Sequence, residues 1–413
     1  MHASARDILL VYAIRALRAF GFAALGVLLA LYLPSFGLGP TALGAYLSLT
    51  VLTAMALNAL LLSRVDAIGR RRVLALAAAL YAAAGAALAV AHGPVLLVVA
   101  ALLGSLPPGG DGVFSMVEQA VIGNVEPGAR PAVFGRYGLV GSIAGSAGLL
   151  AAGVPALLAA HGGVPSAAGD RGAMAAYAVI GVAVLALVLA LGPEVETRAA
   201  QHADGGGRRP QALGRSRRLL YSMAGLFAAD SFGSAMVTVT LLTYWLHLRF
   251  GLGPGAIALI LFGGRLMATV SYPLAIWLGR RIGMINTAVW THIPSSLLLA
   301  ALPLAGAWPG AAALYVARGL LVEMDVPTRQ AFISGAVDPE ERAAAAGVTT
   351  LGRQLGQLAG PAAGGLALTL AAPALFGVAA AVKIAYDLAL WGLCRRVPER
   401  ALEATAQAAA EGT

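Results

Sequence analysis

Residues 36–40 read Phe-Gly-Leu-Gly-Pro, and the same five residues return at 250–254, 214 positions later. Residues 18–21, Arg-Ala-Phe-Gly, align in the same way with residues 230–233, Asp-Ser-Phe-Gly, at an offset of 212. Each match is short in so Gly- and Ala-rich a chain. The nearly constant offset indicates an internal repeat, and the chain is predicted to consist of two related halves.

The composition requires a membrane. Of 413 residues, 59% are hydrophobic and 11% are charged, and the mean hydropathy is +0.81. A water-soluble surface needs more charge than this, whereas a membrane-spanning helix needs roughly 20 predominantly apolar residues. We therefore predict an all-α membrane protein with twelve transmembrane helices, at residues 8–33, 40–62, 73–91, 94–123, 132–160, 173–191, 218–248, 254–278, 285–305, 310–337, 343–370 and 373–394.

The repeat divides these spans into two pseudo-symmetric six-helix bundles. Six is an even number, so the two copies enter the membrane in the same orientation and are parallel repeats. The predicted domains are an N-terminal bundle at 1–191, a cytoplasmic linker at 192–217, a C-terminal bundle at 218–394 and a cytoplasmic tail at 395–413. The linker is polar and contains three consecutive glycines, so we expect it to let the halves move relative to each other.

The net charge of +9 reflects orientation in the membrane, and we expect no nucleic-acid partner. One predicted face carries only Arg171 and Arg249, an asymmetry that places both termini in the cytoplasm. Lys383 is the only lysine, and such Arg- and Ala-rich usage is typical of a GC-rich bacterial genome, so the predicted membrane is a bacterial inner membrane. The opposite, cytoplasmic face carries Arg6, Arg64, Arg70, Arg71, Arg72, Arg130, Arg198, Arg208, Arg209, Arg215, Arg217, Arg218, Arg280, Arg281, Arg342, Arg395, Arg396 and Arg400.

The loop between the second and third spans resembles a motif of the major facilitator superfamily. Asp66, Gly69, Arg70 and Arg71 fit the Gly, Asp and paired basic positions of that family's conformational-switch loop. The resemblance covers essentially the whole chain and implies alternating access between two bundles around one central site. The family carries sugars, drugs, peptides, anions and siderophores, so a small-molecule substrate is implied without its identity.

Four ionisable residues stand deep in predicted spans. A charge at the bilayer centre costs at least ~2.5 kcal/mol, which makes such residues functional candidates. Arg18 and Asp230 occupy equivalent repeat positions with opposite sign, and Glu118 and Arg329 repeat that relation in spans four and ten. The resemblance implies that all four face the central cavity as substrate- or proton-binding residues. The alternative is a pair of fixed salt bridges, Arg18 with Glu118 and Asp230 with Arg329.

The fourth span is interrupted by Pro-Pro-Gly-Gly-Asp at 107–111. This sequence cannot continue a regular helix, and a break at mid-membrane is tolerated only where protein or water meets the freed backbone groups. Asp111 is predicted either to bind substrate or to cap the helix that restarts there. Both roles stay open at this point.

Spans ten and twelve contribute further charges. Arg318, Glu323 and Asp325 form a polar strip in span ten, and we include both acidic residues among the candidate substrate- or proton-binding groups. Lys383 and Asp387 are four residues apart in span twelve, a spacing that places them on one helix face. They are predicted to form a structural ion pair.

Two other features are interpreted as packing. The glycine-rich segment 356–365 resembles the family's antiporter signature but lies in span eleven, whereas the signature belongs to span five. Span five has Gly141, Gly145 and Gly148 without the proline. Small residues at such spacing allow close helix contact. His292 in span nine is predicted to be a packing residue as well.

These features predict a secondary transporter that exports a small anionic or zwitterionic molecule in exchange for protons. The buried carboxylates supply proton sites, and the buried arginines favour an anionic group. A proton-coupled uptake symporter fits the same residues. An enzyme would need a nucleophile with a base or a metal cluster, but the six histidines are scattered and Cys394 is the only cysteine. An enzyme or a receptor is therefore a remote alternative, and we expect a monomer in membrane lipid, with no cofactor or metal.

Overall fold

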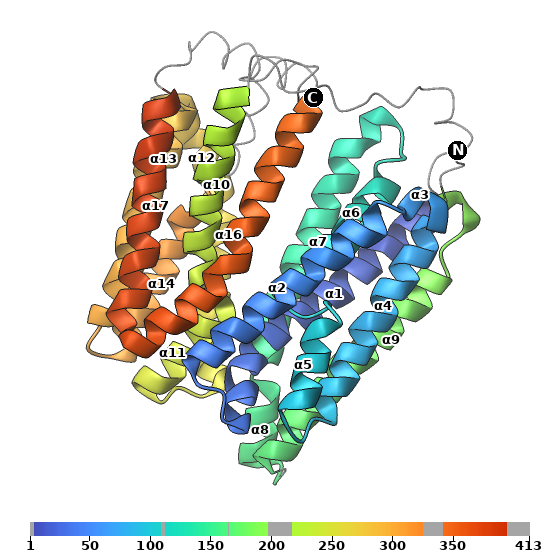
Figure 1. Ribbon diagram of the computed structural model, residues 1–413, viewed down its shortest axis with the longest axis horizontal. Helices are drawn as coiled ribbons and strands as arrows, with labels where there is room; N and C mark the ends of the chain where they lie inside the picture. The colour runs from blue at the N-terminus through green and yellow to red at the C-terminus, as the bar shows by residue number, and fades with distance from the viewer. Residues whose placement is uncertain (1–3, 109–111, 164, 197–216, 325–341, 395–413) are drawn as a thin grey trace. The chain divides into compact units, whose positions relative to one another are not determined.

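The structure is a computed structural model that describes residues 4–108, 112–163, 165–196, 217–324 and 342–394 (Figure 1). Every regular element in these residues is a helix. Nine helical stretches among them are long and apolar enough to cross a membrane. The predicted class, an all-α membrane protein, is confirmed.

The nine stretches coincide with predicted spans. Four of them consist of two consecutive helices. The nine stretches are α1 (Ala5–Tyr32) with η1 (Leu33–Phe36), α2 (Pro40–Leu62), α4 (Arg70–Ala89), α7 (Arg130–Ala151) with α8 (Val154–His161), α9 (Ser166–Leu189), α10 (Arg217–Met236) with α11 (Val239–Phe250), α12 (Pro254–Ile282), α13 (Met284–Ala301) with η5 (Leu302–Leu304), and α17 (Ala372–Cys394).

Helices also occur where the three remaining spans are predicted, so the structure is consistent with twelve spans. Span four consists of α5 (Pro94–Leu102) and α6 (Gly112–Ile122), span ten begins as α14 (Trp308–Val322), and span eleven is α16 (Arg342–Leu370). Non-helical residues 103–108 follow α5, which confirms the predicted interruption.

The chain divides into two compact units. The first comprises Met1–Gly206 and Val239–Leu259, and the second comprises Gly207–Thr238 and Ile260–Thr413. The first unit therefore includes α11, which the predicted division assigns to the C-terminal bundle. The predicted six-helix boundaries stay a prediction.

Contacts between α11 and α1 explain this placement. Thr240 Oγ1 at the start of α11 donates a hydrogen bond to the carbonyl oxygen of Gly26 in α1, at 2.7 Å. A buried hydroxyl satisfied by a backbone carbonyl contributes about 1 kcal/mol. The sequence repeat does not predict such a contact, because it shows which segments are equivalent and not which helices pack together.

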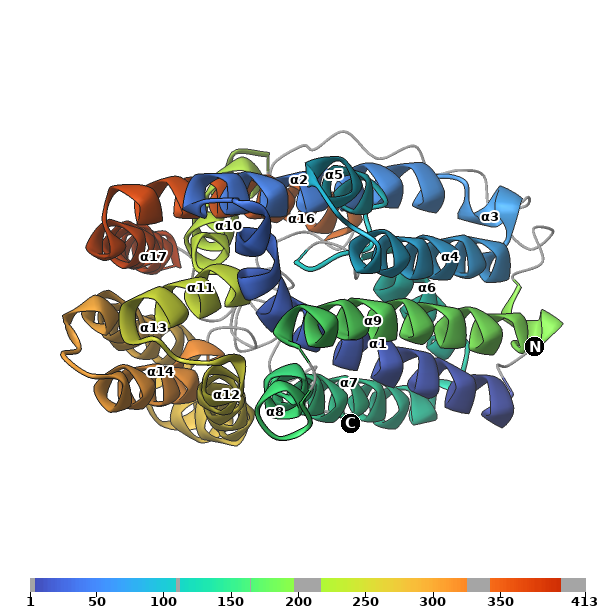
Figure 2. The ribbon, with the colours of Figure 1, turned by 90° about the horizontal axis from the view of Figure 1, so that it is seen from below.

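Small residues let the helices of the first unit approach closely. There α1 packs on α7 and α9, and α4 packs on α9 (Figures 1 and 2). A Cβ on Gly148 of α7 would collide with the carbonyl oxygen of Phe20 in α1. A Cβ on Gly85 of α4 would lie 2.5 Å from the backbone nitrogen of Ala178 in α9. In lipid, where apolar side chains gain little by association, this close backbone contact holds helices together.

In the second unit, glycines allow the same close backbone contact between α10 and α16. A Cβ on Gly352 would collide with the carbonyl oxygen of Ala224, and one on Gly356 with that of Ala228. This contact supports the interpretation of the glycine-rich segment in span eleven as helix packing. Helix α10 also packs on α17, α17 packs on α13, and α13 packs on α14.

Candidate functional site

A buried ion pair joins α1 and α6 in the first unit. Arg18 Nη2 lies 2.7 Å from Glu118 Oε2, and Arg18 Nε donates to Oε1 at 3.1 Å. Both side chains are fully buried. Tyr137 of α7 donates its hydroxyl to Glu118 Oε2 at 2.7 Å. The paired, charge-assisted geometry is the strong form of this interaction, so the structure contains the Arg18 to Glu118 salt bridge that the sequence offered as an alternative.

Aromatic rings complete this cluster. The guanidinium carbon of Arg18 lies 4.3 Å from the ring centroid of Phe114, and that of Arg15 lies 5.1 Å from the ring centroid of Tyr137. Such contacts are attractive cation–π interactions. We call Arg15, Arg18, Glu118 and Tyr137 the first-unit cluster, which contains two guanidinium groups and one carboxylate.

Asp230 of α10 finds its partner on α17. Lys383 Nζ donates to Asp230 Oδ1 at 2.8 Å and to Ser234 Oγ at 2.7 Å. Asp230 is 8% exposed and Lys383 is 2% exposed. Sequence reasoning missed this pair, because it paired Lys383 with the nearby Asp387. The predicted partner of Asp230, Arg329, lies outside the described residues.

The carboxylate of Asp387 bonds instead to α13. His292 Nδ1 lies 2.8 Å and 2.9 Å from the two carboxylate oxygens of Asp387, and both residues are buried. The prediction of an ion pair between Lys383 and Asp387 is therefore wrong for this structure, because each has a closer partner on another helix. His292 was assigned to packing. The signal that could have found it was an imidazole inside an apolar span, which needs a polar partner when buried.

The remaining candidates from spans four and ten are less completely described. Glu323 is the C-cap residue of α14 and interacts electrostatically with Arg318. Asp111, Asp325 and Arg329 lie outside the described residues. Within the described ranges, no group of three or more His, Cys, Asp or Glu side chains could hold a metal ion.

The predicted switch loop is organised around Gly69, the N-cap of α4. Its φ is +96°, a backbone conformation that side chains with a Cβ rarely adopt. The carboxylate of Glu196, which follows α9 and η3 (Pro193–Val195), accepts hydrogen bonds from the backbone nitrogens of Arg70 at 2.7 Å and Arg71 at 3.2 Å.

This carboxylate satisfies helix donors that otherwise lack partners, and it interacts favourably with the positive end of the helix dipole. Arg71 also donates to the carbonyl oxygen of Leu189 at the end of α9. Glu196 was not among the predicted site residues. Asp66 belongs to α3 (Val65–Ile68), and its side chain lies outside the description.

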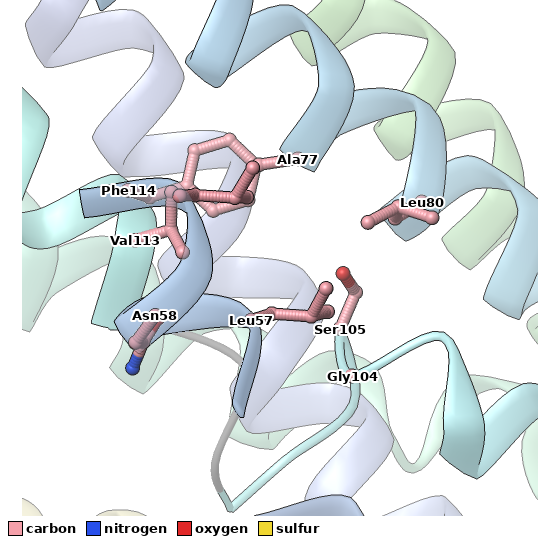
Figure 3. A pocket seen from close by; sticks show the side chains of 9 residues that line it. Leu57, Asn58, Ala77, Leu80, Gly104, Ser105, Val113 and Phe114 are labelled. Carbon is pink, nitrogen blue, oxygen red and sulfur yellow. The ribbon is translucent and has the colours of Figure 1, made fainter. Parts of the chain in front are cut away.

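A small pocket lies beside the break in span four (Figure 3). Side chains of α2, α4, the broken segment and α6 line it, including Asn58, Leu80, Ser105 and Phe114. It has room for about one water molecule. Phe114 belongs both to this pocket and to the ring contact with Arg18, so the break lies directly beside the buried ion pair.

Comparison with known proteins now gives the class. The model of the Major Facilitator Superfamily matches residues 11–322, so the chain belongs to that superfamily. An uncharacterized membrane protein of Saccharomyces cerevisiae, YJR124C, is 25% identical over 392 residues, covering 87% of each chain.

Solved structures agree with this fold. The nucleoside transporter NupG matches with a TM-score of 0.71 and 14% identity, over 95% of this chain and 100% of the other. A D-xylose-proton symporter matches with a TM-score of 0.69 and 16% identity, over 96% and 99%. At such low identity the likeness shows the fold alone. The protein is a multi-pass membrane protein with a transporter fold.

Proposed function

We propose that this protein is a secondary active transporter that exports a small anionic or zwitterionic molecule by alternating access, in exchange for protons. The observation that carries the proposal is that each unit holds a buried cluster of ionisable groups inside apolar spans. Charged groups there are costly, and they are retained mainly where they bind or move something. We place the protein in a bacterial inner membrane, as a monomer with both termini in the cytoplasm.

The cargo class follows from the first-unit cluster. Arg15 and Arg18 bring two guanidinium groups into this cluster, Arg18 against the carboxylate of Glu118 and Arg15 over the ring of Tyr137. Guanidinium groups stay charged and bind carboxylates and phosphates through paired donors. An anionic group of the cargo can compete with Glu118 for these donors, which would open the pair during transport.

The second unit supplies the proton-binding chemistry. Asp230 occupies the position equivalent to Arg18 in the repeat, and its partner Lys383 is an ammonium group, which can change partners or protonation state when buried. A carboxylate that alternates between Lys383 and a proton can couple cargo movement to a proton gradient. One structural neighbour is named a D-xylose-proton symporter, and this name supports the proposal that the present chain is also coupled to protons.

The first experiment identifies the cargo and its coupling. Purified protein is screened by thermal shift against carboxylates, amino acids, nucleosides and sugars, and compounds that raise Tm are tested in proteoliposomes. An acid interior drives accumulation if the cargo is exchanged for protons, whereas an acid exterior drives it in a symporter. If neither gradient changes flux, proton coupling is wrong.

The matching variant is Asp230→Asn. We expect gradient-driven accumulation to fall at least about tenfold while the protein stays folded, because an amide cannot exchange a proton at neutral pH. Asp170→Asn in α9 is the control, because it removes a carboxylate that belongs to neither cluster. Equal flux through Asp230→Asn and the parent protein would rule out this role for Asp230.

A further inference from the structure

Two arginines of the second unit lie at the same depth in the membrane. Arg265 is eleven residues after the start of α12 at Pro254, and Arg318 is ten residues after the start of α14 at Trp308. The two helices enter from the same side, because one span of opposite direction, α13, separates them along the chain. At a rise of roughly 1.5 Å per residue, each arginine is about 15 Å from the beginning of its helix, near the middle of a hydrocarbon core of about 30 Å.

Close packing of α12 on α14 brings these arginines together with a tyrosine (Figure 2). A Cβ on Gly319 would collide with the carbonyl oxygen of Gly264, and a Cβ on Gly264 would lie 2.5 Å from ring carbon Cε1 of Tyr315. Gly264 directly precedes Arg265, and Gly319 directly follows Arg318. Tyr315 interacts electrostatically with both arginines. We call Arg265, Tyr315 and Arg318 the α12–α14 cluster.

The hydrogen-bond donors of this cluster are not paired within the described part of the chain. The Nε atom of Arg318 is buried and has no hydrogen-bond partner there. Asp230 and Glu323 interact electrostatically with Arg318, which makes its charge less costly but leaves this donor without an acceptor. Among the same residues, the guanidinium of Arg265 and the hydroxyl of Tyr315 also lack a hydrogen-bond partner. A donor without an acceptor is unfavourable in a membrane interior, so the cluster is suited to an acceptor that comes from solution.

The exposure of Arg265 indicates that water, and not lipid, surrounds its charge. Arg265 is exposed in the structure although it lies near mid-depth. A guanidinium in lipid at this depth is costly, and only arginines near helix ends can extend their charge to the membrane surface. The exposed side of the cluster therefore borders a space that a solute from the aqueous phase can enter.

The packing that the two halves share does not explain these arginines. At the repeat offset of 212, Arg265 corresponds to Thr53 and Arg318 corresponds to Leu106. Neither of these first-unit residues is ionisable. A charge that the fold itself required would be expected in both units. The two arginines are therefore specific to the second unit, and a ligand explains them better than helix packing does.

We propose that the α12–α14 cluster binds an oxyanion, which is the carboxylate or phosphate group of the cargo. Guanidinium groups keep their charge and offer paired N–H donors to the oxygen atoms of such a group, and the hydroxyl of Tyr315 is a further donor. In the first unit Arg18 is already bonded to Glu118, so an anion that binds there has to displace a carboxylate. Binding at Arg265 requires no such displacement.

This site deepens the proposed function, and its use in transport rests on that function. The binding of the anion itself needs neither a proton gradient nor knowledge of the complete cargo. It can therefore be tested with simple anions on the full-length protein.

The test is chemical labelling of arginine side chains in purified protein held in a neutral detergent. Phenylglyoxal reacts with accessible guanidinium groups, and mass spectrometry measures the rate at which each arginine is labelled. The probes are inorganic phosphate for a phosphate group and acetate and succinate for a carboxylate, at an ionic strength kept constant with chloride, and glycerol is the uncharged control. We expect saturating phosphate or carboxylate to slow the labelling of Arg265 at least about tenfold. Arg281, exposed at the end of the same helix, should be labelled at one rate throughout.

Two variants examine the other members of the cluster. Arg318→Gln should raise the probe concentration that half-protects Arg265 at least about tenfold, because it removes a charged donor. Tyr315→Phe keeps the ring against Gly264 and should raise that concentration about threefold, as expected for one neutral hydrogen bond. It decides the result if Arg318→Gln does not fold. Arg281→Gln is the matched control and should leave the protection of Arg265 unchanged.

The preference among the probes identifies the anion, since protection by phosphate alone or by carboxylates alone names the group that the cargo carries. If no probe slows the labelling of Arg265, or if Tyr315→Phe and Arg318→Gln both leave its protection unchanged, the proposal is wrong.

Liposome flux measured on the same preparations separates this proposal from the proposed function. If a proton gradient drives the flux of an anionic cargo while Arg265 is not protected, the cargo binds elsewhere and the proposed function stands. If Arg265 is protected while the gradient has no effect on flux, the anion site stands and proton-coupled transport is wrong.

Discussion

The first-unit cluster and the second-unit series, which consists of Asp230, Lys383, Asp387 and His292, are built from different ionisable groups. In the first, arginine meets Glu118, and Tyr137 adds a third group to the same carboxylate. In the second, a lysine and a histidine meet two aspartates. Guanidinium groups do not lose their protons in proteins, whereas lysine and histidine can. Under the proposed function, this difference is the reason why we attribute binding of an anionic group to the first unit and proton exchange to the second.

The largest expected effect comes from breaking the first-unit pair. Glu118→Gln leaves Arg18 buried at zero exposure without its carboxylate. Removing one partner of a buried pair costs about 3–5 kcal/mol, so we expect a marked fall in the free energy of unfolding, measured by denaturant titration in detergent. Asp230→Asn should cost less, because Lys383 keeps Ser234 and can turn to Asp387. If the free energy of unfolding fell equally in Glu118→Gln and Asp230→Asn, the two buried pairs would not differ in how strongly each depends on its carboxylate.

A double-mutant cycle sharpens the comparison within the second unit. Asp230→Asn and Lys383→Met, alone and combined, should show an interaction free energy of about 1–3 kcal/mol, because residues in direct contact are not additive. The cycle of Lys383→Met with Asp387→Asn should give a smaller value. If the interaction free energy of Lys383 with Asp387 were larger than that of Lys383 with Asp230, the ion pair predicted from helix spacing would be correct after all.

The smallest effect concerns equivalent glycines in the two units. Gly356 faces the carbonyl oxygen of Ala228 with no room for a Cβ, while at Gly145 a Cβ would lie 3.7 Å from the carbonyl oxygen of Ala19. Gly356→Ala should therefore destabilise by about 1–3 kcal/mol through overpacking.

Gly145→Ala is the matched control. It should be neutral or stabilise by up to about 1 kcal/mol, since alanine favours helix. Thermal unfolding of the two variants measures the difference, and a similar loss at both positions would contradict the asymmetric packing.

Much of the fold was predictable from the sequence. Twelve apolar stretches are long enough to span, and every described one coincides with a helix. The interruption of span four followed from consecutive prolines and glycines, which no continuous helix accommodates. The placement of α11 was not predictable, because the hydrogen bond of Thr240 to α1 joins residues 214 positions apart.

The site was predictable in its residues more than in its pairs. Arg18, Glu118 and Asp230 stood out because charge is rare inside apolar spans, and all three are buried in the structure. Lys383 was missed as the partner of Asp230 because its spacing of four residues along one helix favoured a pair with Asp387. Glu196 was missed because a carboxylate after a span looks like an ordinary loop residue.

The sequence by itself determined that lipid surrounds most of the protein and that the fold is all-α. It also determined the two-fold repeat and the inverted charges at equivalent positions. These properties follow from composition and from periodicity along one chain. Only the tertiary structure decided that Lys383 bonds Asp230 and that His292 bonds Asp387. The physical reason is that hydrophobic length is a local property, whereas an ion pair between helices depends on which faces meet. Those faces are selected by the packing of small residues over the whole bundle.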